Sequence, residues 1–108
     1  MEDLMTDRMR QLQQMLQKEP NDAFLLYALA LEYKKINDSA NALAYLDRVI
    51  SIDPGYCYAY HQQGLVHESS GDLAAARQAY SAGIEAARKK GDAHARQEIE
   101  SALMMIEN

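Results

Sequence analysis

The chain has 108 residues, of which 48% are hydrophobic and 25% charged, a composition that is ordinary for one small globular domain and excludes global disorder. The net charge of −5 argues against nonspecific binding to nucleic acid or to an anionic membrane surface, because both need a basic face. The single cysteine, Cys57, excludes an internal disulfide, so we expect a cytoplasmic protein.

The first half of the chain predicts three helices. Apolar residues at helical spacing, from Met5 to Leu16, predict an amphipathic helix over residues 4–19 that ends before Pro20. A second helix is expected from Ala23 to about Lys35. Asp38 can cap a third helix, which ends at the next proline. Its apolar stripe consists of Ala42, Leu43, Leu46, Val49 and Ile50.

The second half predicts three more helices in the same style. One runs from Cys57 to Ser69, and Asp72 caps another that runs from Leu73 to about Lys89. A last helix begins after Gly91-Asp92, with an apolar stripe of Ala95, Ile99, Ala102, Leu103 and Ile106. The short turns between helices favour antiparallel neighbours.

The two halves also repeat each other. Pro20 and Pro54 lie 34 residues apart, and the same spacing relates the turn at residues 37–38 to that at residues 71–72. Small residues also fall on small residues, because Ala30 pairs with Gly64 at this spacing. We therefore divide the single domain, residues 1–108, into a helix over 4–19, repeats over 23–56 and 57–90, and a capping helix over 91–107.

These residues resemble the tetratricopeptide repeat family. The first repeat carries the family's pattern at Leu26, Leu29, Ala30, Tyr33, Ala42, Leu46 and Pro54, and the second carries it at Tyr60, Gly64, Ala76 and Tyr80. The second repeat departs from it at Gln63, at His67 and at Arg88, which replaces a proline and suggests a longer helix. The resemblance implies an all-α fold of about six helices, in which antiparallel helix-hairpin repeats stack as a short right-handed superhelix (an α-α solenoid).

In this family the first helix of each repeat lines a concave groove that binds peptides or partner helices. The resemblance therefore implies an adaptor that binds a segment of a partner protein. The implied groove residues are Phe24, Tyr27, Leu31, Lys34, Tyr58, His61, Gln62 and Leu65. Some relatives clamp a C-terminal carboxylate with lysine and asparagine, but Tyr27 and Leu31 stand at those positions here, so we do not expect binding of a heat-shock chaperone tail.

Two alternatives remain open. The terminal helices could fold over the groove, in which case Phe24, Tyr27 and Tyr58 would be core residues. All six methionines lie near the chain ends, and methionine adapts readily to partners. The protein could therefore be a structural subunit that forms a homo-oligomer, such as a homodimer, through its apolar terminal helices.

The residues that could bind a metal or act in catalysis do not form a known motif. Cys57 and His61 are four residues apart on a helix, but no third or fourth ligand falls at useful spacing, so we predict no metal site. We expect His67 at a packing position, His94 at the surface and Glu98 in solvent. No phosphate-binding loop or nucleophile motif occurs, so we predict neither catalytic residues nor a cofactor, and no enzyme.

Overall fold

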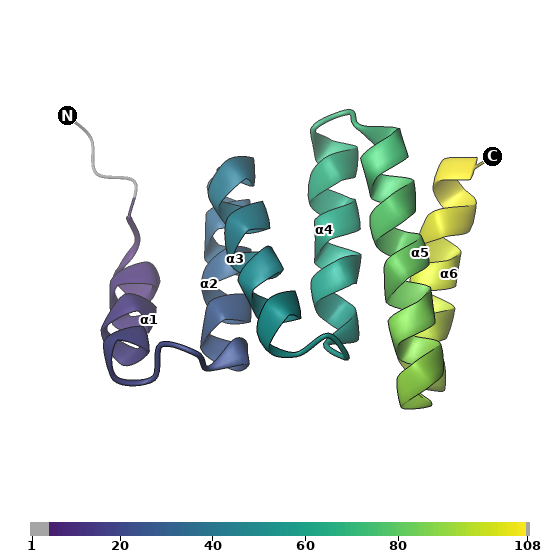
Figure 1. The fold of residues 1–108 in the computed structure, drawn as a ribbon. Helices are drawn as coiled ribbons and strands as arrows, with labels where there is room; N and C mark the ends of the chain where they lie inside the picture. Colours follow the sequence, from purple (N-terminus) through teal and green to yellow (C-terminus); the bar gives the residue numbers. More distant parts are fainter. Residues whose placement is uncertain (1–4, 108) are drawn as a thin grey trace.

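The computed structural model describes residues 5–107, and this part of the chain folds into six helices without a strand. The helices are α1 (Asp7–Lys18), α2 (Ala23–Lys35), α3 (Ser39–Ile52), α4 (Cys57–Ser69), α5 (Leu73–Lys90) and α6 (Ala93–Glu107). Figure 1 shows them as an elongated stack with α1 at one end, α3 in front of α2 and α5 in front of α6. The predicted all-α fold of stacked helical hairpins is confirmed.

The helices begin where the sequence supplies a capping side chain. Asp22, Asp38 and Asp72 each accept a hydrogen bond from the backbone N–H three residues later, which satisfies a donor that the helix leaves free. Thr6 does the same for α1, which therefore begins at Asp7. Residue 4, where the predicted first helix begins, lies outside the described residues, as does Met1.

Helix α5 is longer than α3, as the arginine in place of a proline suggested. It continues to Lys90 and ends at Gly91, whose φ of 76° is the left-handed conformation that favours glycine. Asp92 then caps α6 through the N–H of Ala95. Because of the extension, α6 begins 36 residues after α4, whereas α4 begins 34 residues after α2.

The core runs through the stack at the contacts between neighbouring helices. Ala42 and Ala76 are completely buried, as expected for positions where helices cross closely. Tyr80 is also completely buried, and it fits because residue 64 is glycine. A Cβ atom at Gly64 would overlap the ring of Tyr80, so the small residue is required for the α4–α5 contact.

The terminal helices extend the stack at its two ends. Helix α1 packs against α2, where its Met9 and Leu12 join a core cluster with Leu25 and Leu29. Helix α6 packs against α5 and also contacts α4. Within the described residues, no helix is both long enough and apolar enough to cross a membrane.

Candidate functional site

A hydrogen bond joins α2 to α4 through residues that the sequence predicted in one groove. The Lys34 Nζ atom donates to Gln62 Oε1 at 2.8 Å, although the two residues lie 28 positions apart. The Gln62 side chain also interacts with the Tyr27 hydroxyl. Lys34 and Tyr27 of the first repeat and Gln62 of the second therefore lie on one surface, which we call the concave surface after the predicted groove.

The degree of burial of these residues is intermediate. Phe24 is 64% exposed, and the other seven predicted groove residues are half-buried. Helix α1 packs on Leu25 and Leu29, which lie on a different side of α2 from Phe24 and Leu31 at helical spacing. Phe24 is thus not a core residue.

Helix α6 adds residues to the concave surface that the sequence analysis did not place there. Glu98 acts electrostatically on the Tyr58 hydroxyl, and His94 pairs with Glu98. The ring of His61 lies 6.5 Å from that of Tyr58, between ring centroids, and 5.9 Å from that of Tyr80. We expected Glu98 to be a solvated surface charge, but it lies beside the predicted groove residues.

Burial shifts the pKa values of several groups on this surface. Desolvation raises the pKa of the Tyr27 and Tyr58 hydroxyls and lowers that of the Lys34 ammonium, because burial disfavours each charged form. Desolvation also lowers the pKa of His61, against smaller raising effects of Glu98 and Glu68. At neutral pH, His61 is therefore a neutral ring among charged neighbours.

The surroundings of Cys57 favour a structural role over a reactive one. It is buried, and its Sγ donates to the Gly55 carbonyl oxygen at 3.3 Å. Burial raises the pKa of the thiol, which disfavours the nucleophilic thiolate. Among the described residues, no group of three or more His, Cys, Asp or Glu side chains is arranged to hold a metal ion.

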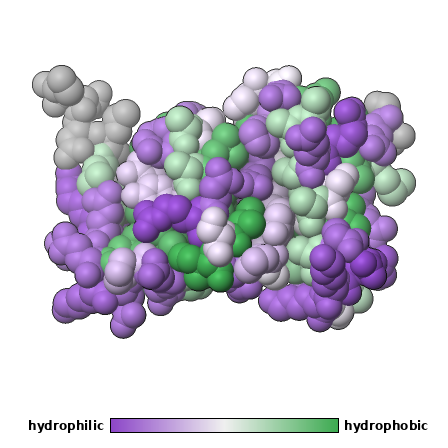
Figure 2. Space-filling model, in the orientation of Figure 1, coloured by the Kyte–Doolittle hydropathy of each residue, from purple (hydrophilic) through white to green (hydrophobic). Residues whose placement is uncertain are grey.

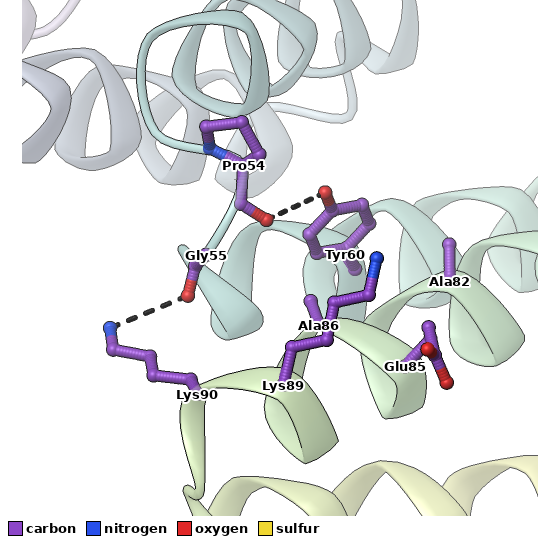
Figure 3. Close-up of a pocket in the computed structure, with 8 residues that line it drawn as sticks. All are labelled: Pro54, Gly55, Tyr60, Ala82, Glu85, Ala86, Lys89 and Lys90. Atoms are coloured by element: carbon purple, nitrogen blue, oxygen red, sulfur yellow. Dashed lines mark hydrogen bonds between the residues drawn. The ribbon is translucent and has the colours of Figure 1, made fainter.

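A separate notch of about 460 Å³ lies between the α3–α4 loop and the second half of α5. Figure 3 shows its lining, in which the Tyr60 hydroxyl donates to the Pro54 carbonyl at 2.8 Å and Lys90 Nζ donates to the Gly55 carbonyl at 3.4 Å. These bonds fasten the loop to α4 and α5. Two polar side chains of the notch, Tyr60 and Lys90, are thus used within the fold.

The face on which α3 and α5 lie in front is mostly hydrophilic. Figure 2 shows it largely purple, with a compact green patch near the lower end of α3. Ile52, at the end of α3, is 42% exposed, less than Phe24 on the concave surface.

Comparisons with known proteins agree on one kind of repeat. A family model described as "Tetratricopeptide repeat" matches residues 25–56 and 58–90. A TPR repeat-containing protein of Pseudomonas aeruginosa is 34% identical over 88 residues, which cover 82% of this chain and 84% of that protein.

Two solved structures extend the agreement to the fold. The crystal structure of a tetratricopeptide repeat domain protein from Salinibacter ruber is 32% identical, with a TM-score of 0.73, and the match covers 80% of this chain and 96% of that chain. The TPR2B domain of yeast Sti1, in a complex with pHsp70, has a TM-score of 0.84 at 18% identity over 92% of this chain and 79% of its own. At that identity, the second likeness concerns the fold alone.

Proposed function

The chain belongs to the tetratricopeptide repeat family, and from this membership we propose that it is an adaptor that binds a peptide or helical segment of a partner protein on its concave surface. Repeats of this family are in general protein-binding modules. The proposed contact residues are the eight that the sequence predicted on α2 and α4.

The exposure of Phe24 is the observation that carries the proposal. A phenylalanine ring that is 64% exposed leaves apolar surface in water, and its burial by a partner would be favourable. Tyr27 and Leu31 on the same helix, and Tyr58 and Leu65 on α4, are half-buried. Large aromatic residues that are partly exposed and held in place are typical anchors of protein interfaces.

The hydrogen bonds of the surface support the same conclusion. Gln62 is hydrogen-bonded to Lys34, so these two side chains are held in position before a partner arrives. A surface that is ordered in advance loses less conformational entropy when it binds. The complex of the yeast Sti1 domain concerns that domain, and we do not transfer its partner to this chain.

The experiment is a binding selection with the full chain and a library of random dodecapeptides, followed by affinity measurements on the selected peptides. We expect Phe24→Ala and Tyr27→Ala to weaken binding by at least about tenfold, as interface anchors do, while the helical circular-dichroism signal stays unchanged. Leu73→Ala is the matched control, because Leu73 is exposed at the start of α5. Equal losses in the control, or unfolding of the Tyr27 variant, would refute the assignment.

A homo-oligomer built through the terminal helices is the second candidate. Met104 and Met105 of α6 are 64% and 79% exposed, which is the observation that favours it. Light scattering after size-exclusion chromatography decides the question. A monomer at micromolar concentration excludes this candidate, whereas a dimer that Met105→Glu dissociates would support it.

We propose further that the protein acts in the cytoplasm, without a cofactor and without catalysis of its own. The buried thiol of Cys57 and the acidic net charge are compatible with this view. Turnover that His61→Ala abolishes, found in a panel of hydrolase and transferase assays, would contradict it.

A further inference from the structure

Three charged side chains of the concave surface act on His61. Lys34, Glu68 and Glu98 each act electrostatically on the imidazole of His61. They come from three helices, α2, α4 and α6. Two of the three are negative, so the α4–α6 part of the surface is acidic, while Lys34 makes the α2 part positive.

The two carboxylates of this surface differ from most glutamates elsewhere in the molecule. Four of those pair with lysine or arginine: Glu32 with Lys35 at 3.0 Å, Glu85 with Arg88 at 2.5 Å, Glu100 with Arg96 at 2.8 Å and Glu107 with Arg77 at 3.7 Å. On the concave surface, the Tyr80 hydroxyl donates to Glu68, while His94 pairs with Glu98. Within residues 5–107, neither carboxylate has a lysine or arginine as partner.

Aromatic rings lie directly beside these carboxylates. Glu98 acts electrostatically on the hydroxyl of Tyr58, and the ring of Tyr58 is stacked with that of His61. A guanidinium group can bond a carboxylate and lie against an aromatic ring at the same time, and a lysine ammonium can make the same two interactions less specifically. The surface thus offers both partners that a cationic side chain uses.

Lys34 fixes which way such a partner lies. Its ammonium donates to the neutral amide of Gln62 rather than to a carboxylate, so its positive charge repels a cation placed on α2. Phe24 and Leu31, on the same helix, instead offer apolar contact. A partner therefore gains most with its apolar side chain on α2 and its cation on α4 and α6.

We propose, building on the function proposed above, that the bound segment carries an arginine or lysine that binds Glu98 beside the rings of Tyr58 and His61. Apolar side chains of the same segment lie on Phe24 and Leu31. The partner is thus a basic and apolar segment of another protein.

The test uses the full chain and fluorescein-labelled dodecapeptides taken from the random-library selection, each made with Arg, Gln or Glu at its one charged position. Fluorescence anisotropy at low salt should show the arginine peptide binding about fivefold more tightly than its glutamine version, the upper range for one half-exposed ion pair, and the glutamate version binding most weakly. The preference should shrink as salt screens the charges.

Two variants distinguish binding of the cation at Glu98 from a nonspecific effect of the protein's negative net charge. Glu98→Gln keeps the size and shape of the side chain, removes its charge and should abolish the preference for arginine. Glu100→Gln removes the same charge two residues away, where it pairs with Arg96, and should preserve that preference.

A preference for glutamate, no preference, or an arginine preference that survives in Glu98→Gln overturns this inference and leaves the proposed function standing. Failure of every peptide to bind overturns both.

Discussion

The substitution Gly64→Ala tests the packing on which the α4–α5 contact depends. The new methyl group would overlap the ring of Tyr80, which is completely buried and cannot move into solvent. The ring must shift, and its hydroxyl then leaves Glu68. We expect a destabilised but still helical protein.

The magnitude follows from three contributions. Overpacking of a buried site costs about 1–3 kcal/mol, and loss of the hydrogen bond to Glu68 costs about 1 kcal/mol. Replacement of glycine by alanine in a helix returns about 1 kcal/mol. The net loss is about 2 kcal/mol, which lowers Tm by roughly 10 °C in a domain of this size.

Thermal and urea unfolding followed by circular dichroism measure this effect, and a double-mutant cycle assigns its cause. In a Tyr80→Leu background the ring is absent, so Gly64→Ala should be neutral or slightly stabilising there. A neutral effect in the unmodified protein would refute the overlap argument. An equal loss in both backgrounds would show that the destabilisation does not pass through Tyr80.

Three further predictions concern single groups. Because burial lowers the pKa of His61 below its ordinary 6.5, the unfolded chain binds a proton at this residue more readily than the folded chain does. The contribution of His61 to the free energy of unfolding is therefore complete above pH 6.5 and is lost as pH falls below 6.5 towards the lowered pKa. Urea titrations at pH 7.5 and pH 5.5 should show a smaller difference in stability for His61→Gln than for the exposed-site control His94→Gln. Cys57 should react with a disulfide reagent at pH 8 at least roughly tenfold more slowly than a free thiol, since it is buried and its pKa is raised, and a fast reaction without denaturant would contradict that assignment. Asp72→Ala removes the cap of α5 and should cost about 1 kcal/mol in unfolding experiments, whereas an unchanged Tm would mean that the cap bond does not stabilise the helix.

The helices could be read from the sequence because each boundary has a local chemical cause. The predicted spans of α2 and α4 agree with the structure, since aspartate caps and turn residues act within a few positions of themselves. Arg88 in place of proline also predicted that α5 runs on, and it does so to Lys90.

The contribution of α6 to the concave surface could not be read in the same way. At the 34-residue spacing of the repeats, the residue equivalent to Gln62 is Arg96, and Glu98 falls on no groove position. The extension of α5 moves α6 by two residues, so the equivalent of Gln62 becomes Glu98. The sequence marked the start of α6 after Gly91-Asp92, but the 34-residue spacing of the repeats does not contain this offset, so it assigns no groove position to Glu98.

The hydrogen bonds between side chains of different helices could not be predicted from the sequence for another reason. The bonds from Lys34 to Gln62 and from Tyr80 to Glu68 join side chains with several rotatable angles. Which rotamers are occupied depends on the packing of all their neighbours, and no spacing rule contains that information.

Charged side chains at both ends of the stack disfavour head-to-tail assembly. The face of α6 that a following helix would cover carries Arg96 and Glu100, at positions where α4 has Tyr60 and Gly64, and these two charges pair with each other at 2.8 Å. At the other end, Arg8 stands where α3 has the buried Ala42 and is exposed. A second copy stacked on either end would have to bury these charges, which is costly without matching partners. Phe24, in contrast, is an exposed apolar side chain that a partner can bury without burying these charges. The lower cost of desolvation favours the concave surface over the ends of the stack as the place where a partner binds.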